Sequence, residues 1–404
     1  MNALAADETM DVVVIGLGVA GEAVAGDLAA AGLDVVGVES QLVGGECPYW
    51  GCIPSKMMIR AAGLIAETSR VTGLAGQATI TPDWSQVAHR IRAEATDDWN
   101  DQVAVDRFVG HGGRFVRGRA TMVGLGLVEV DGQTFEARRG VVLATGTTAA
   151  IPPVPGLADT PYWTNREAIA TATLPDSLVV LGGGAIGLEL AQVFARFGTT
   201  VTIIEVADRL LAAEEPEASA LITEVLQGEH IAVVTGATVD RISHDGDVTG
   251  HGAFTHIATY QATIAVRDIL GTPGPGAEYD AVPRVTFTDP EIGAVGLTEA
   301  QARERGLAVR TGLAQVPSSA RGWIHKAGND GLIKLVVDAD TGLLVGATSA
   351  GPTGGEVLGA LAVAVHGRVP VERLRHMIYA YPTFHRGIED ALRDLDASAG
   401  SESG

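Results

Sequence analysis

The stretch DVVVIGLGVAGEAVAGDLAAAGLDVVGVES, residues 11–40, decides the fold of this chain. It predicts an apolar strand, the turn Gly16-x-Gly18-x-x-Gly21, an alanine-rich helix, and a second strand that ends at Glu39. In this context the first glycine makes a tight turn, the second admits a pyrophosphate close to the backbone, and the third packs the helix on the strand. Glu39 is placed to accept hydrogen bonds from ribose hydroxyls. The stretch therefore predicts a dinucleotide-binding unit.

The same pattern returns 166 residues later, with Gly182, Gly184 and Gly187 in the turn and Glu205 closing the second strand. A glycine-rich turn with no ligand is unlikely to repeat strand, helix and terminal acid in one register. We therefore expect two bound dinucleotides. Glu205 would repel a 2′-phosphate, which favours NADH over NADPH at the second site, whereas the nearby Arg209 weakens that preference.

Composition excludes several classes of protein. The 404 residues allow two or three domains, and 46% of them are apolar, as in a folded globular chain. The net charge of −21 disfavours binding to nucleic acid or to anionic lipid. No stretch reaches the ~18 apolar residues of a membrane span, and the N-terminus has no basic segment of a secretory signal. We expect a cytoplasmic protein with neither a nucleic-acid nor a membrane partner.

The chain's two cysteines, Cys47 and Cys52, lie together in GGECPYWGCIPSK, residues 44–56. A bridge between them would close a short loop and add only about 2 kcal/mol, so a structural role is a weak explanation. Pro54 favours the first turn of a helix, whose N-terminus would stabilise a Cys52 thiolate, and Lys56 follows on the same face. Two thiolates without further Cys or His ligands make an incomplete zinc site, so the preferred interpretation is a redox dithiol without metal.

These motifs resemble the pyridine nucleotide-disulfide oxidoreductase family, most closely its dihydrolipoamide dehydrogenase and mercuric reductase branch. The resemblance covers nearly the whole chain. It rests on both glycine turns, on the cysteine stretch with Gly45, and on these further motifs: Ala144-Thr145-Gly146, Gly246-Asp247, Thr255-His256-Ile257-Ala258, Phe287-Thr288-Asp289-Pro290-Glu291 and Tyr381-Pro382-Thr383.

The resemblance implies an electron relay. FAD would bind at the first glycine turn and NADH at the second, and electrons would pass from NADH through FAD to a Cys47–Cys52 disulfide and on to an acceptor. By position, Cys52 resembles the thiol beside the flavin, and Cys47 resembles the outer thiol that exchanges with substrate. Lys56 and Glu189 match the family's ion pair beside the flavin.

The resemblance also implies an architecture, an α/β fold with two Rossmann-like doubly wound units and a C-terminal α+β dimerisation domain. Asp247 would bond the FAD ribityl chain, and the helix near His256 would point its N-terminus at the flavin. Two subunits would form a homodimer in which each lends Tyr381 to the other's disulfide. The expected bounds are 1–150 with 245–280 for the FAD-binding domain, 151–244 for an incomplete NAD-binding domain, and 281–404 for the interface domain.

The sequence departs from the family in two places. Tyr381 and Arg386 stand where dihydrolipoamide dehydrogenases have the His–Glu dyad that acts as general base, and His376 and His385 are the nearby candidates to replace it. After Glu205, roughly 60–70 residues of a complete doubly wound unit are missing, including the last strand of the FAD sheet. These departures leave two alternatives open: a flavin-dependent quinone or metal-ion reductase that needs no dyad, and a shortened, catalytically impaired dimer without enzymatic function.

The shortened region has its own expected elements. A helix is predicted at about 214–227, a strand at 231–234 and a short strand at 239–242. Residues 244–247, His-Asp-Gly-Asp, then arrive without the apolar strand that precedes this motif in the family. An alternative interpretation of these residues is a surface turn between antiparallel strands of the NAD-binding domain.

Overall fold

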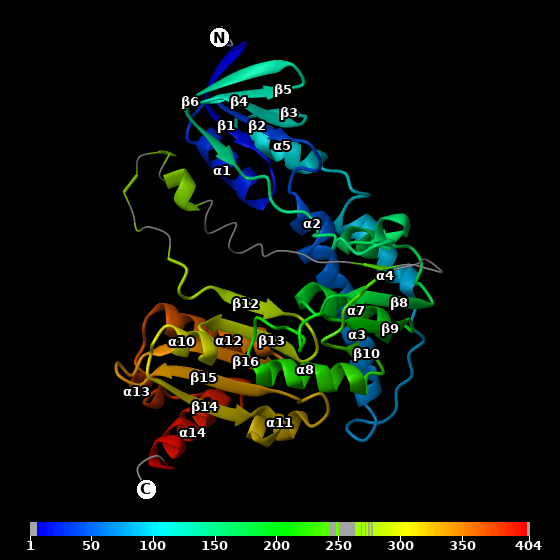
Figure 1. Ribbon diagram of the computed structural model, residues 1–404, viewed down its shortest axis with the longest axis vertical. Helices are drawn as coiled ribbons and strands as arrows, with labels where there is room; N and C mark the ends of the chain where they lie inside the picture. The colour runs from blue at the N-terminus through cyan, green and yellow to red at the C-terminus, as the bar shows by residue number, and fades with distance from the viewer. Residues whose placement is uncertain are drawn as a thin grey trace.

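Three β-sheets with surrounding helices make up the protein, shown as a computed structural model in Figure 1. The structure describes residues 6–241, 248–249, 263–267, 269–270, 272–273, 275 and 278–401. In this view the first sheet lies at the top and the C-terminal sheet at the bottom, and the second sheet lies beside the C-terminal sheet. No helix among the described residues is both long and apolar enough to cross a bilayer.

The first sheet has the strand order β3-β2-β1-β6-β5-β4. The strands are β1 Glu8–Ile15, β2 Val35–Glu39, β3 Arg114–Arg117, β4 Ala120–Gly124, β5 Leu127–Val130 and β6 Gln133–Leu143. Strands β3, β2, β1 and β6 are parallel, and β4 and β5 continue the sheet as an antiparallel ribbon. Helices α1 Val19–Ala30 and α5 Gln102–Gly110 pack on this unit, whose core includes Val12, Leu28 and Phe108.

The turn from β1 to α1 confirms the structural roles predicted for Gly16 and Gly21. Gly16 has a φ of +90°, a conformation that side chains strongly disfavour. A Cβ on Gly21 would lie 1.8 Å from the carbonyl oxygen of Gly16, so only glycine lets α1 approach the strand this closely. The local sequence therefore fixes both the turn and the helix contact.

The second sheet is parallel throughout, in the order β10-β9-β8-β11-β7. Its strands are β7 Tyr162–Trp163, β8 Ser177–Leu181, β9 Thr200–Ile204, β10 Ala232–Val234 and β11 Val248–Thr249. Three helices belong to the same unit: α6 Asn165–Ala170, α7 Ala185–Arg196 and α8 Pro216–Gly228. Helix α8 and strand β10 confirm the elements predicted at 214–227 and 231–234.

The region after β10 corrects two predictions. Residues 239–241, the described part of the strand predicted at 239–242, form no strand. Val248 and Thr249 pair in parallel with both β8 and β7. The predicted bounds assign these two residues to the FAD-binding segment 245–280, but they lie in the second sheet. They occupy the position between β8 and β7, where a doubly wound sheet has a parallel strand. Residues 244–247, for which the surface turn is the alternative interpretation, lie outside the described residues. Asp247 and His256 lie outside the described residues.

Residues 263–267 and 269 return to the first unit. Ala265, Val266 and Ile269 pack against the core beneath β1 and α1. The last residues of β6, Gly140 to Leu143, pair with β1, and no other described strand adjoins them. Leu143 is consequently 63% exposed. The described residues thus lack the final strand of the first sheet, as the shortened sequence predicts.

The C-terminal domain is an antiparallel sheet in the order β12-β13-β16-β15-β14. Its strands are β12 Pro283–Thr286, β13 Glu291–Gly296, β14 Val309–Gln315, β15 Leu332–Asp338 and β16 Leu344–Gly351. Its helices are α10 Glu299–Glu304, α11 Ala320–His325, α12 Gly354–His366, α13 Val371–Arg375 and α14 Gly387–Ser401. Alternate residues of β15 pack with α12 and α14 in the core of this domain. Leu332 instead joins the apolar core of the second unit, so that core extends into the C-terminal domain.

Candidate active site

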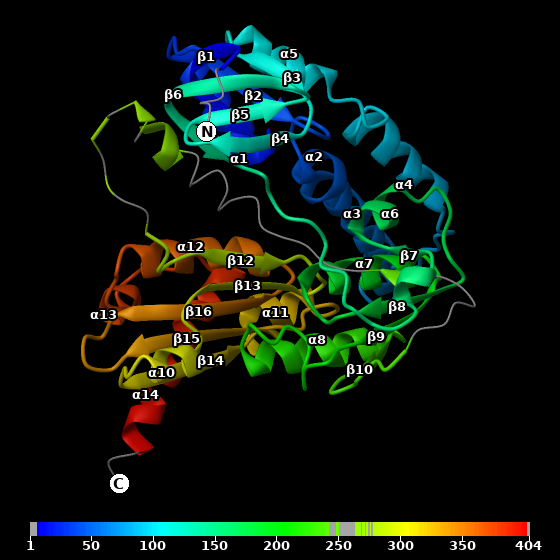
Figure 2. The ribbon, with the colours of Figure 1, turned by 45° about the horizontal axis from the view of Figure 1, so that its top comes forward.

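A cavity of about 2130 Å³ lies where the two nucleotide-type units meet. Helix α2 Glu46–Trp50 and helix α3 Cys52–Arg70 form part of its wall, and α3 runs from the first sheet toward the second (Figure 2). The structure brings these predicted site residues to its lining: Gly18, Glu39, Gly45, Cys47, Cys52, Lys56, Gly146, Gly184 and Glu189. Residues from three separate parts of the sequence therefore converge on one space.

The two glycine turns repeat down to their hydrogen bonds. Glu39 accepts from the N–H of Leu17 at 2.8 Å and from that of Gln41 at 2.7 Å. Glu205 accepts from the N–H groups of Gly183 and Ala207, which are the equivalent positions 166 residues later. Both acids are thus held in place by backbone donors of their turns.

The N-termini of the two helices that follow these turns open onto the same cavity. Gly18 is the N-cap of α1 and Gly184 is the N-cap of α7, and both line the cavity. Their unpaired N–H groups and the positive ends of the helix dipoles make such termini binding sites for phosphate. The other glycines of the turns, Gly16, Gly21, Gly182 and Gly187, shape the turns and are not among the lining residues.

A close contact between glycines seats the cysteine segment on the first turn. Gly18 and Gly44 form an isolated parallel bridge, and a Cβ on Gly45 would lie 2.8 Å from the Cα of Gly18. Gly45 also has a φ of +69° and is the N-cap of α2. The backbone of the cysteine segment can therefore approach the first phosphate-type turn this closely only because residue 45 is glycine.

Helix geometry separates the two cysteines. Cys47 lies in the short helix α2, and Cys52 is the first residue of the 19-residue helix α3. Pro54 lies in the first turn of α3, as predicted, because that turn needs no N–H from it. Both cysteines are half-buried and line the cavity. The dipole of α3 favours the thiolate form of Cys52.

Lys56 and Glu189 form the predicted ion pair, with 2.7 Å between Nζ and Oε2. The second oxygen of Glu189 accepts a hydrogen bond from the N–H of Phe287, and the Lys56 ammonium lies 4.5 Å from the centre of the Phe287 ring. Glu189 is buried, so its charge requires this pairing. The contact ties α3, α7 and the C-terminal domain together at the cavity.

Sequence reasoning missed a clamp on α2 from the second unit. Asn165 donates to the carbonyl oxygen of Trp50 at 2.6 Å, and the Arg166 guanidinium pairs with Glu46 and lies 5.6 Å from the Trp50 ring. Trp50 in turn stacks on Trp99, with 5.2 Å between the rings. Nothing in the sequence around residue 165 signals this contact, because it joins segments more than 100 residues apart.

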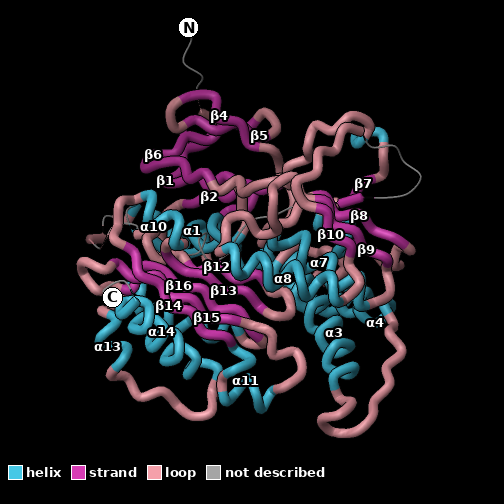
Figure 3. The backbone as a smooth tube through the Cα atoms, turned by 60° about the horizontal axis from the view of Figure 1, so that its bottom comes forward, coloured by secondary structure: helices cyan, strands magenta, loops and turns pink. Residues whose placement is uncertain are grey.

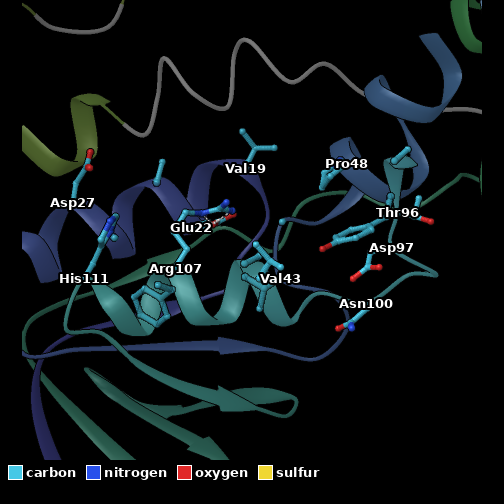
Figure 4. A pocket seen from close by; sticks show the side chains of 18 residues that line it. Val19, Glu22, Asp27, Val43, Pro48, Thr96, Asp97, Asn100, Arg107 and His111 are labelled. Atoms are coloured by element: carbon cyan, nitrogen blue, oxygen red, sulfur yellow. Dashed lines mark hydrogen bonds and ion pairs between the residues drawn. The ribbon is translucent and has the colours of Figure 1, made fainter. Parts of the chain in front are cut away.

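A smaller cavity of about 490 Å³ lies along α1 and α5 (Figure 4). Its walls carry both signs of charge, and Glu22 and Arg107 form an ion pair across α1 and α5. Pro48 and Tyr49 of α2 reach it, whereas neither cysteine lines it. The larger cavity is therefore the candidate active site.

Tyr381, the remaining predicted catalytic residue, does not line this cavity. It follows α13 on the surface of the C-terminal domain, is 69% exposed, and has the Arg386 guanidinium 5.3 Å from its ring centre. His376 is exposed and 3.2 Å from Glu372, and His385 is exposed. Among the described residues of a single chain, no histidine that could replace the His–Glu dyad lines the cavity of Cys47 and Cys52.

The donor set of the cavity fits a dinucleotide flavin. Gly18 and Gly45 line the cavity, α1 presents its N-terminus at Gly18, and Glu39 accepts a hydrogen bond from the N–H of Leu17 in the turn. The described residues hold no group of His, Cys, Asp and Glu arranged to bind a metal ion.

Comparisons with known proteins agree with this geometry. The family model "Pyridine nucleotide-disulphide oxidoreductase" matches residues 10–270, and the model of that family's dimerisation domain matches residues 282–392. The chain belongs to the pyridine nucleotide-disulphide oxidoreductase family. It is accordingly an oxidoreductase, with the α/β fold and the dimerisation domain that the sequence predicts.

Relatives of this family member include two kinds of enzyme. A mercuric reductase from Bacillus cereus is 29% identical over 454 positions, covering 96% of this chain and 71% of the relative. A dihydrolipoyl dehydrogenase from Halobacterium salinarum is also 29% identical, covering 94% of this chain and 95% of the relative. Because the first alignment exceeds the chain's 404 residues, at least 50 of its positions face gaps in this chain, which confirms that the chain is shortened.

Solved structures show the same fold. The flavoprotein disulfide reductase RclA from Escherichia coli, solved as a Cu(II) complex, superposes with a TM-score of 0.83 at 23% identity, covering 95% of this chain and 99% of that one. LpdA from Mycobacterium tuberculosis superposes with a TM-score of 0.80 at 22% identity, covering 95% and 99%. The shortened chain thus keeps the overall fold of these two solved structures.

Proposed function

We propose that this oxidoreductase passes electrons from NADH through FAD to a redox-active pair, Cys47 and Cys52, and from there to an acceptor. One observation supports the proposal above all: a single cavity receives the N-termini of α1 and α7 and both cysteines. A metal site or a structural bridge would not need two phosphate-type turns beside the thiols.

FAD would lie along α1, with its phosphates at Gly18, a ribose at Glu39 and its ring system toward Cys52 and Lys56. Bound there, it would accept a hydride from NADH and deliver an electron pair to the disulfide. Cys52, at the start of α3, is the thiol that the helix dipole holds as a thiolate against that ring. Cys47, in the separate helix α2, is the thiol that exchanges with the acceptor.

Two subunits would complete the site as a homodimer. Tyr381 is exposed on the C-terminal domain and absent from the cavity of its own chain. A match to a dimerisation domain over residues 282–392 supports pairing through this part of the chain. Under this proposal, Tyr381 of one subunit faces the cysteines of the other.

The second nucleotide site is proposed to prefer NADH. Glu205 is fixed in the turn by two backbone donors, so its charge opposes a 2′-phosphate. Arg209, which weakened this expectation, donates to the carbonyl oxygens of Leu211, Glu214 and Ala212. Its guanidinium is therefore engaged by its own loop instead of extending toward the ribose.

Steady-state rates should show kcat/KM for NADH at least about tenfold above that for NADPH, which corresponds to about 1.4 kcal/mol. Replacing Arg209 with glutamine should change the NADPH value less than about twofold, whereas replacing Glu205 with serine should narrow the preference. A wild-type preference for NADPH, or loss of NADPH use in R209Q, would overturn this assignment.

Thiol alkylation tests the relay itself. After reconstitution with FAD, incubation of the oxidised protein with NADH should expose two alkylatable thiols, Cys47 and Cys52, detected by mass spectrometry of the intact chain. Protein without FAD should expose none, because NADH reduces a disulfide only through the flavin. Equal alkylation with and without FAD would reject the proposed function.

A second candidate is a reductase for quinones or metal ions. The observation that favours it is the absence of the dyad, since Tyr381 and Arg386 occupy those positions and no histidine lines the cavity. Such acceptors take electrons without a base for thiol exchange. The two candidates differ in whether turnover needs Cys47.

A further inference from the structure

The short helix α2, which carries Cys47, depends on other parts of the chain for its position. It has only five residues, and a helix of this length is not stable by itself in water. Cys52, by contrast, begins α3, a 19-residue helix that can be followed as a long cyan coil in Figure 3. Pro54 and Met58 bury one side of α3. The position of Cys47 relative to Cys52 is therefore set by the contacts that hold α2.

A hydrogen bond from the second unit holds the joint between α2 and α3. The side-chain amide of Asn165, in the first turn of α6, donates to the carbonyl oxygen of Trp50 at 2.6 Å. That carbonyl belongs to the peptide bond between Trp50 and Gly51, and Gly51 directly precedes Cys52. The first turn of α6 is itself ordered by a capping box. Asn165 thus restrains the backbone that connects the two cysteines.

Two side chains on one face of α2 are held as well. Glu46 and Trp50 are four residues apart, so they share a face of the helix. The Arg166 guanidinium donates from Nε to Glu46 at 3.0 Å and lies 5.6 Å from the centre of the Trp50 ring. The Trp50 ring also stacks on Trp99, with 5.2 Å between the ring centres. Both charged side chains are partly exposed, so their attraction is screened and the hydrogen bond and ring contacts supply more of the restraint.

We propose that Asn165, Arg166 and Trp50 are positioning residues that hold Cys47 beside Cys52 and thereby set the reduction equilibrium of the pair. The inference rests on the proposed function, because it takes these cysteines as the redox pair. In the oxidised protein the disulfide bond itself ties α2 to α3. Reduction leaves this task to the contacts of α2 and to the intervening backbone. The contacts therefore favour closure of the disulfide, because they keep the effective concentration of one thiol at the other high.

Equilibration of the full chain with mixtures of reduced and oxidised dithiothreitol tests the inference without flavin. In this reaction one dithiothreitol reduces one Cys47–Cys52 disulfide to two thiols and becomes its own cyclic disulfide, so electrons and protons balance. Alkylation followed by mass spectrometry of the intact chain gives the ratio of dithiol to disulfide. Asn165→Ala should shift this ratio toward the dithiol about fivefold, the usual effect of one net hydrogen bond on an equilibrium constant. For a two-electron couple this shift raises the reduction potential by about 20 mV.

Further variants separate the contacts of α2 from a general loss of stability. Trp50→Ala should shift the ratio in the same direction, whereas Trp50→Phe, which keeps an aromatic ring, should restore most of the wild-type value. Asn329→Ala is the matched control. Asn329 lies between α11 and β15 of the C-terminal domain (Figure 3), and its side chain donates to the carbonyl oxygen of Gly322 at 2.8 Å. This control loses the same kind of hydrogen bond outside the cavity of the cysteines and should leave the ratio unchanged.

The alkylation rates of the reduced chain give a second readout. A half-buried thiol reacts faster when the element that carries it opens more often. Iodoacetamide should therefore modify Cys47 at least about threefold faster in Asn165→Ala and Trp50→Ala than in wild type, and modify Cys52 of α3 at a rate within about twofold of wild type. Peptide mass spectrometry distinguishes the two sites. Loosening of the whole fold would instead raise both rates together.

Equal ratios of dithiol to disulfide in wild type, Asn165→Ala and Trp50→Ala would overturn the inference while leaving the relay intact. The same holds for a shift toward the disulfide, for an equal shift in Asn329→Ala, or for an equal rise in the alkylation rates of both cysteines. A wild-type chain that forms no Cys47–Cys52 bridge in any dithiothreitol mixture would instead overturn the proposed function.

Discussion

Serine in place of Cys47 is expected to lower NADH-driven disulfide reduction at least about a thousandfold while the bound flavin is still reduced by NADH. The outer thiol is the nucleophile toward the acceptor, and a serine hydroxyl cannot replace a thiolate in exchange. The geometry supports this division, since Cys47 lies in α2 and Cys52 begins α3. NADH consumption and flavin absorbance, followed in one experiment, separate the two steps.

The matched variant is Cys52→Ser, which should also lose disulfide reduction. Ser55→Ala in the same helix turn should retain it, because Ser55 carries no proposed role. Disulfide turnover that survives in Cys47→Ser would contradict the assignment. Turnover with a quinone that survives while disulfide reduction vanishes would instead favour the second candidate function.

Methionine in place of Lys334 is expected to lower the free energy of unfolding by about 3–5 kcal/mol, the usual cost of leaving a buried charge unpaired. Lys334 of β15 lies 3.3 Å from Glu215, 2.9 Å from Glu217 and 3.0 Å from Glu299. The side chains of Lys334 and Glu215 are only 5% and 3% exposed. The cluster joins the start of α8 in the second unit to the C-terminal domain, so the variant should loosen that contact.

The pH dependence follows from the charges of this cluster. Burial alone would lower the pKa of Lys334, but hydrogen bonds to Glu217 and Glu299 outweigh it and raise the pKa above its ordinary 10.5. Burial would raise the pKa of Glu299, but hydrogen bonds from Arg303 and Lys334 outweigh it and lower the pKa below its ordinary 4.5. The stability that Glu299 contributes is therefore present above pH 4.5 and is lost as the pH falls through the lowered pKa of Glu299. The stability that Lys334 contributes is present below pH 10.5 and is lost as the pH rises through the raised pKa of Lys334.

Urea unfolding of wild type and Lys334→Met at neutral and acidic pH measures this difference. The difference in the free energy of unfolding between wild type and Lys334→Met should be largest at neutral pH. It should shrink in acid, because the carboxylates around residue 334 become neutral. Lys326→Met, at an exposed lysine of the same domain, is the control and should change stability by less than about 0.5 kcal/mol. Adding Glu215→Gln to Lys334→Met should recover part of the loss, and a K334M protein as stable as wild type would contradict the buried-pair interpretation.

Local patterns in the sequence predicted the parts of the fold that depend on neighbouring residues. Gly16 and Gly21 predict the turn because both positions require glycine. Gly16 has a positive φ, and Gly21 lies in close contact with the backbone of Gly16. The pairing of Lys56 with Glu189 could be inferred only by resemblance, since 133 residues separate them. The absence of the last strand could be predicted because too few residues follow Glu205 for a complete doubly wound unit. Among the described residues, no strand pairs with β6 on the side of Gly140 to Leu143 that faces away from β1.

Other features depend on contacts that no local pattern encodes. The clamp of Asn165 and Arg166 on α2 forms only when the second unit packs against the first. The placement of Val248 and Thr249 beside β8 escaped prediction because two residues carry no periodic signal, and their partners come from the sheet as a whole. The contact of the Arg321 guanidinium with the Phe384 ring likewise joins segments about 60 residues apart in the chain.

The absorbance spectrum of the FAD-reconstituted protein during anaerobic titration with NADH tests the central claim most directly. A Cys52 thiolate held against the flavin predicts a long-wavelength charge-transfer band as the cysteines are reduced, and this band should be missing in Cys52→Ser. A protein that takes up no FAD, or one whose titration is identical in wild type and Cys52→Ser, would contradict the claim.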